Sequence, residues 1–147
     1  MASGTARPGI WQSGMRAGLL VVIANYVVLK VAEAVSGGEL SVQVGGGDSS
    51  LRVGAFVVAV ATLVSAVLLI LLGLLLRRVM RAPRRLFVAL VVLLTGLSVV
   101  VPLSSGAPGG TVAALAVMHL LTGVFVGSAV ALTLTELDTS VPDRAVD

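Results

Sequence analysis

The 147-residue chain is 57% hydrophobic and only 12% charged, whereas ordinary soluble proteins carry about 25% charged residues. Water is therefore a poor solvent for most of the chain, and lipid-exposed helices fit this composition better than a globular core. Because the sequence contains no cysteine, disulfides, cysteine-ligated metals and thiolate catalysis are excluded. The net charge of +3 arises largely from basic residues between two apolar runs, a pattern that predicts no nucleic-acid binding.

Four apolar segments follow one another along the chain, and each is long enough to cross roughly 30 Å of hydrocarbon as a helix. We expect spans at about residues 15–35, 53–76, 86–103 and 112–134. The first span is the weakest, because Lys30 and Glu33 lie in its last turns, and a cleaved signal peptide stays open as an alternative. The pattern predicts an all-α, up-and-down four-helix membrane bundle that forms one domain.

Basic residues predict the direction of the spans, because short cytoplasmic loops carry an excess of Lys and Arg. Five arginines separate the second and third spans, and Arg7, Arg16 and Arg144 belong to the same side of the membrane. The other side has only Lys30 and Arg52, both next to spans. We therefore expect a plasma-membrane protein with both termini in the cytoplasm, including a flexible tail over residues 136–147. The outer connections at residues 36–50 and 104–110 are expected to be plain loops.

Polar residues inside the spans are the candidates for an intramembrane site. His119 is the only histidine, and it lies roughly 12 Å below the outer start of its span, too deep for its ring to reach water. Asn25 and Tyr26 occur at a similar depth in the first span, so we expect His119 to form a hydrogen bond with one of them. Two roles stay open for His119: a packing contact between helices, or a proton relay or pH sensor.

Lys30 and Glu33 follow Tyr26 on one helical face. With His119 they could form a polar stripe along a pathway through the membrane. Lys30 is also close enough to the outer boundary to extend its ammonium group to the lipid headgroups and pair there with Glu33. We favour this second interpretation, because a charge at mid-membrane is costly and this one need not be buried.

Small residues predict where the fourth span packs. Gly123 and Gly127 form a GxxxG pattern, and Ala116 lies on the same face, whereas Val126 does not. Such a face lets two helix backbones approach closely. The pattern leaves open whether the partner helix belongs to the same chain or to a second copy in a homo-oligomer. Phe87, at the inner start of the third span, is expected to be an interfacial anchor.

The arginines between the second and third spans are the clearest charged feature. They offer contacts to anionic lipid headgroups worth about 1 kcal/mol per side chain, although retention in the cytoplasm alone also explains them. The five residues are Arg77, Arg78, Arg81, Arg84 and Arg85.

The sequence contains no pattern typical of catalysis, cofactor binding or metal binding. There is no glycine-rich phosphate loop, no HExxH motif and no pair of buried carboxylates. We expect a non-enzymatic structural or accessory component that has no cofactor and whose partner is the lipid bilayer. A small transporter or an oligomeric pore with a polar pathway near His119 is the alternative. A membrane enzyme acting on lipid is disfavoured, because no nucleophile has a neighbouring base.

Three stretches together resemble a known family. They are Arg81-Ala-Pro-Arg-Arg85, Val101-Pro-Leu-Ser-Ser105 and Ala114-Leu-Ala-Val-Met-His-Leu-Leu121. Over nearly its whole length the chain is similar to the uncharacterised DUF6069-type family of small actinobacterial four-helix membrane proteins. The resemblance implies a four-helix membrane fold and, because that family has no established activity, no particular chemistry.

Overall fold

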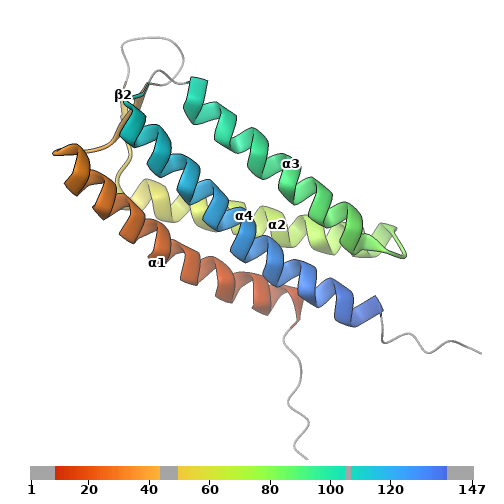
Figure 1. Ribbon diagram of the computed structural model, residues 1–147. Coiled ribbons are helices and arrows are strands. Elements are labelled where there is room, and N and C mark those ends of the chain that lie inside the picture. Colours follow the sequence, from red (N-terminus) through yellow and green to blue (C-terminus); the bar gives the residue numbers. More distant parts are fainter. Residues whose placement is uncertain (1–8, 44–49, 105–106, 139–147) are drawn as a thin grey trace, which may run out of the picture.

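The computed structural model describes residues 9–43, 50–104 and 107–138. Its main elements are four long helices that run alternately up and down the bundle (Figure 1). Each helix is long and apolar enough to cross a membrane. The expected all-α membrane bundle is therefore confirmed, and the chain is a multi-pass membrane protein. The helices are α1 (Ile10–Ser36), α2 (Ala55–Val79), α3 (Pro83–Ser104) and α4 (Gly109–Asp138).

Two segments outside the expected spans differ from the sequence-based expectation. The segment between α1 and α2 is not a plain loop, because it contains the antiparallel strands β1 (Ser41–Gln43) and β2 (Ser50–Arg52). At the other end of the chain, α4 continues to Asp138, so residues 136–138 of the expected flexible tail are helical. The rest of that tail, residues 139–147, lies outside the described residues.

The helix ends follow local backbone chemistry. α1 ends at Gly37, which adopts the left-handed conformation with φ of 71° and donates its backbone N–H to the Glu33 carbonyl. Glycine tolerates this conformation because it has no Cβ. Pro83 is the first residue of α3, where its missing N–H breaks no helical hydrogen bond and its fixed φ suits a helix start. The short turn between α2 and α3 brings the five arginines to one end of the bundle.

α4 is the central helix of the bundle, because it packs on each of the other three helices. Of the helix pairs that pack together, α2 and α3 make the fewest contacts with each other. Figure 1 shows them close together at their connecting turn and diverging away from it. The side of the bundle between α2 and α3 is therefore left partly open.

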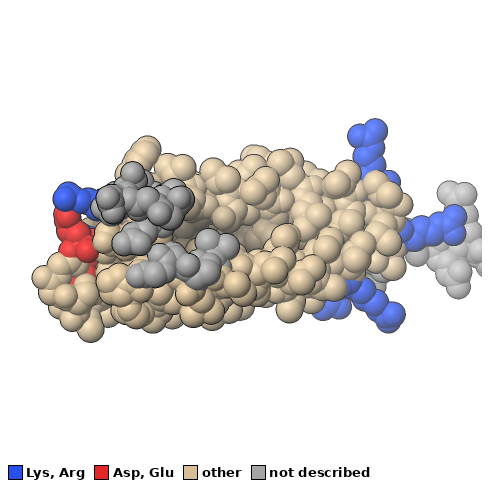
Figure 2. Space-filling model, turned by 90° about the horizontal axis from the view of Figure 1, so that it is seen from above, with Lys and Arg blue, Asp and Glu red and all other residues tan. Residues whose placement is uncertain are grey.

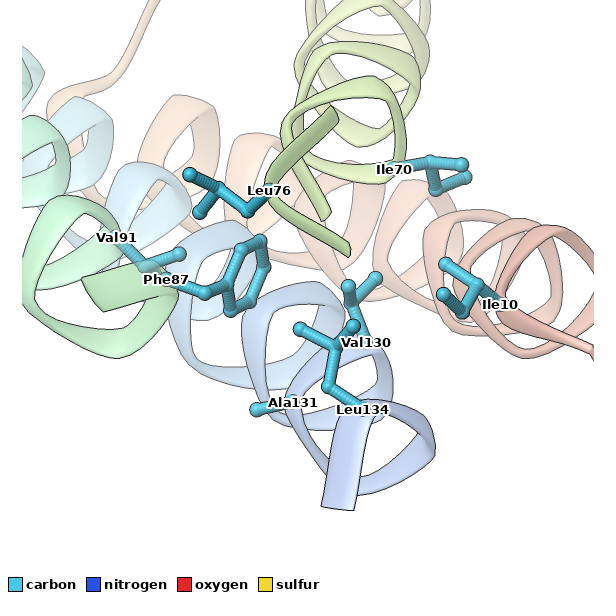
Figure 3. Close-up of a cluster of buried hydrophobic side chains, with 8 residues drawn as sticks. All are labelled: Ile10, Ile70, Leu76, Phe87, Val91, Val130, Ala131 and Leu134. Carbon is cyan, nitrogen blue, oxygen red and sulfur yellow. The ribbon is translucent and has the colours of Figure 1, made fainter. Parts of the chain in front are cut away.

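The core near the α2–α3 turn is built from apolar side chains of all four helices (Figure 3). Phe87 is 0% exposed in this core, so its expected role as an interfacial anchor is wrong. The reason is its position one turn after Pro83, which places it on the inner face of α3 together with Val91. The buried cluster comprises Ile10, Ile70, Leu76, Phe87, Val91, Val130, Ala131 and Leu134.

The outward faces of the helices are apolar. Leu20, Phe56 and Val92 are each more than half exposed, which would be unfavourable in water but fits contact with lipid tails. Figure 2 shows basic side chains around one end of the bundle and a mixture of acidic and basic ones at the other. The visible surface between the two ends carries neither kind, as expected for a hydrocarbon-facing band.

Candidate functional site

Glycines of α4 face α3 of the same chain. A Cβ at Gly127 would lie 2.8 Å from Cγ1 of Val91, and a Cβ at Gly123 would overlap the side chain of Thr95. Ala116, which shares this face in the sequence, is only half-buried. Val126, which was expected to lie off the packing face, is 0% exposed, because the central helix α4 also packs on α1 and α2.

A second pair of glycines brings α1 against α2. A Cβ at Gly18 would lie 2.9 Å from Cβ of Ala66, and a Cβ at Gly14 would overlap the side chain of Ile70. We did not predict this contact from the sequence. The signal was present, however, because Gly14 and Gly18 have the same GxxxG spacing as the pair in α4.

Asn25 joins three helices at the centre of the bundle, where its side chain is 1% exposed. Its Nδ2 donates hydrogen bonds to Oγ1 of Thr62 in α2 at 2.9 Å and to Oγ1 of Thr122 in α4 at 3.2 Å. Each threonine hydroxyl in turn donates to a carbonyl of its own helix, at Val58 and Met118, both at 2.8 Å. The three side chains form a buried polar cluster within an otherwise apolar core.

The threonine protons fix the orientation of the Asn25 amide. A hydroxyl has a single proton, and both protons are already donated to backbone carbonyls, so the amide must present its N–H₂ group to the two threonines. Its Oδ1 therefore points away from them. This oxygen is buried and has no hydrogen-bond partner among the described residues. Leaving a buried oxygen without a hydrogen bond typically costs about 1–3 kcal/mol of stability. Asn25 Oδ1 is such an oxygen and can still accept a hydrogen bond.

His119 has a different partner from the one we expected. Its Nδ1 lies 2.7 Å from the carbonyl oxygen of Leu115, and since a carbonyl can only accept, Nδ1 carries the proton. In the neutral ring Nε2 is then an acceptor. The expected hydrogen bond to Asn25 or Tyr26 is wrong, because Asn25 is engaged by the threonines and Tyr26 is 46% exposed on the outer surface of α1.

The other three candidate residues of α1 lie together and away from the cluster of Asn25 with the two threonines. Lys30 Nζ donates to Glu33 Oε2 at 2.7 Å and lies 5.7 Å from the centre of the Tyr26 ring. Tyr26 and Lys30 are exposed on the outer side of α1 and Glu33 beside them is half-buried, whereas Asn25 points inward. The five candidates of the intramembrane site therefore separate into an inner pair, Asn25 and His119, and an outer group.

The inner pair lines one cavity of about 670 Å³ between α2, α3 and α4. Apolar side chains form most of its wall, and exposed Leu68 of α2 and Leu94 of α3 lie at its border. The cavity is thus open sideways, where α2 and α3 diverge. Its hydroxyl-bearing lining residues are Thr62, Ser65, Thr95, Ser98 and Thr122. Among the described residues, no group of three or more potential metal ligands occurs.

The arginine end of the bundle carries a second concave feature. All five arginines are exposed, and Arg84 also lines a groove of about 460 Å³ between α3 and α4. Val88, Val92 and Val124 form part of the apolar wall of this groove. In the described part of the chain the two ion pairs, Lys30–Glu33 and Arg52–Glu39, lie at the opposite end.

Comparison with known protein families gives a match. The profile of a family of unknown function, DUF6069, matches residues 5–136, which is most of the chain. No curated protein and no solved structure matches it.

Proposed function

The chain belongs to the DUF6069 family, whose function is unknown, and we propose that it is a non-enzymatic accessory component of the plasma membrane that binds anionic lipids at its cytoplasmic end. The observation that carries this proposal is the position of Arg84 at one end of an apolar groove. A guanidinium group next to an apolar groove complements a phosphate headgroup with an attached acyl chain. The other four arginines, exposed around the same turn, add to the positive potential there.

The orientation rests on the distribution of basic residues. The α2–α3 turn, the start of α1 and the end of α4 lie at the same end of the bundle (Figure 1), and this end carries the arginine cluster. Short segments rich in arginine stay in the cytoplasm, where the inner leaflet supplies anionic lipids. A cytoplasmic location of both termini therefore accounts for the charge pattern and for the proposed ligand together.

A non-enzymatic role is supported by the partners of the polar groups within the membrane. The amide of Asn25 binds two threonines, His119 binds its own backbone, and Lys30 pairs with Glu33. These are contacts that stabilise helices and their packing. The transporter or pore alternative needs the candidates to line one route, but Tyr26, Lys30 and Glu33 do not line the cavity that reaches His119.

The lipid preference can be tested by native mass spectrometry of protein released from nanodiscs that contain equal amounts of phosphatidylcholine and phosphatidylglycerol. We expect wild-type protein to retain phosphatidylglycerol preferentially. Replacing all five arginines with Gln should abolish the preference, and Arg84→Gln should reduce it by about fivefold, given the usual contribution of one arginine near an anionic surface.

Arg78→Gln is the matched control, because Arg78 is exposed at the same end but does not line the groove. It should reduce the preference less than Arg84→Gln does. Equal retention of both lipids by the wild-type protein would contradict the proposal. If Arg84→Gln and Arg78→Gln reduce the preference for phosphatidylglycerol equally, the groove does not contribute to lipid binding.

A further inference from the structure

The cavity between α2, α3 and α4 offers hydrogen-bond acceptors and few free donors. Four of its hydroxyl groups have already donated their single proton to a carbonyl three or four residues earlier in their own helix. The fifth hydroxyl, on Thr95, lies against Gly123 of α4. The four bonds are Thr62 to Val58, Ser65 to Ala61, Ser98 to Thr95 and Thr122 to Met118, at 2.7 to 2.8 Å.

The ring of His119 adds a further acceptor to the lining. Because His119 donates from Nδ1 to the Leu115 carbonyl, its Nε2 in the neutral ring can only accept. Asn25 Oδ1 also lacks a hydrogen-bond partner among the described residues, but this atom is buried and a molecule in the cavity does not reach it. A molecule that enters the cavity therefore meets acceptors from α2, α3 and α4.

The wall of the cavity determines the rest of the ligand. Among the described lining residues there is no Asp, Glu, Lys or Arg, so a charged group would be desolvated there without a counter-charge. The wall is mainly Val, Leu, Ala and Met, and its volume of about 670 Å³ lies in the range typical of small-molecule sites. The opening between α2 and α3 faces the lipid, so a ligand can enter from the bilayer.

We propose that this cavity binds a neutral, lipid-phase alcohol, whose hydroxyl group donates a hydrogen bond to His119 Nε2 and whose apolar body fills the space between α2 and α3. An alcohol supplies a neutral donor, which the four hydroxyl groups bonded to backbone carbonyls cannot supply. A ketone, ether or ester of the same size presents only acceptors, so it would leave His119 Nε2 without a partner. Binding by hydrogen-bond complementarity of this kind discriminates against an analogue that lacks the donor.

The test uses two photoreactive probes that differ in one group. A diazirine-bearing hexadecan-1-ol and its methyl ether are added separately to the full-length protein in phosphatidylcholine nanodiscs, and labelled peptides are mapped by mass spectrometry. We expect the alcohol to label residues 57–72, 94–98 and 115–123 on the order of tenfold more than the ether does. Because these nanodiscs contain no anionic lipid, the result is independent of the proposed arginine site.

Three variants test whether the probe binds in the cavity and whether His119 accepts its hydrogen bond. Ala61→Phe should abolish labelling of the cavity, because residue 61 lines it, whereas Val60→Phe, on the neighbouring exposed position outside the lining, should leave labelling unchanged. His119→Phe keeps an aromatic ring but removes Nε2, and it should reduce the preference for the alcohol over the ether several-fold. Thermal unfolding in detergent identifies any variant that has lost its fold.

Several results would overturn the proposal. Equal labelling by the alcohol and the ether would show that donors are not selected. Undiminished labelling of folded Ala61→Phe would place the probe outside the cavity. An unchanged preference in folded His119→Phe would show that Nε2 is not the acceptor.

Discussion

Replacing Gly18 with Ala should weaken the packing of α1 on α2. The new Cβ would lie 2.9 Å from Cβ of Ala66, closer than two methyl groups can approach. Neither side chain can rotate away, because a Cβ is fixed by its backbone, so one helix must shift. Relative to an open position, such overpacking typically costs about 1–3 kcal/mol.

A matched control separates this cost from helix propensity. Gly96 of α3 also lies within a helix, but a Cβ there would meet nothing within 4 Å. Gly96→Ala should therefore be neutral or stabilise the bundle by up to about 1 kcal/mol, the usual propensity difference between Gly and Ala. The same gain partly offsets the clash in Gly18→Ala. The difference between the two variants isolates the close approach of α1 and α2.

The free energy of unfolding can be measured by titration with SDS in mixed micelles, followed by the fluorescence of Trp11, the only tryptophan. The double variant Gly18→Ala, Ala66→Gly removes the opposing Cβ, so it should recover stability relative to the sum of the single changes, with a coupling of at least about 1 kcal/mol. Additivity within about 0.5 kcal/mol, or a Gly18→Ala variant as stable as Gly96→Ala, would refute the close approach.

Three further predictions use the same unfolding measurement. Gly127→Leu should destabilise the bundle by about 1–3 kcal/mol through its clash with α3, whereas Val124→Leu, on the exposed face of the same helix, should be nearly neutral; equal effects would argue against this contact. Phe87→Ala should cost about 3–5 kcal/mol, because it leaves a hole in the core, and a loss below about 1 kcal/mol would contradict its burial. Glu33→Gln should leave the unfolding midpoint unchanged, since it breaks a pair in which Lys30 is more than half exposed and such pairs contribute little; a large shift would indicate that this pair is buried in the membrane.

The four helices and their alternating directions could be predicted from the sequence, because a long, uncharged, apolar run of residues crosses a bilayer as a helix. Each run must satisfy its own backbone hydrogen bonds and is therefore helical. Because each span ends on the side of the bilayer where the next one begins, successive helices run in opposite directions. The β1–β2 pairing could not be predicted in the same way, since the Gly-rich connection has weak propensity for any regular structure.

The partners of the polar residues depend on how the helices are rotated and shifted against one another. His119 and Asn25 are at similar depth, and depth alone suggested a pair. α1 packs on α2 with Gly18 facing Ala66, and in this arrangement Asn25 lies beside Thr62 instead. Phe87 shows the same limitation, because its distance from the membrane surface suggested an anchor, while the rotation of α3 placed it inward. Helix rotation is fixed by packing, which the hydropathy of one segment does not encode.

The proposed lipid binding depends most directly on which end of the bundle faces the cytoplasm, because the arginines can bind inner-leaflet lipids only from that side. The chain has no cysteine, so Ser41→Cys in β1 and Ala82→Cys in the α2–α3 turn each introduce one thiol, and both positions are exposed. Intact cells that express each variant are treated with a membrane-impermeant thiol reagent. We predict labelling of the Ser41→Cys variant alone, with Ala82→Cys labelled only after the cells are opened. Labelling of Ala82→Cys but not Ser41→Cys in intact cells would contradict the orientation and, with it, the proposed function.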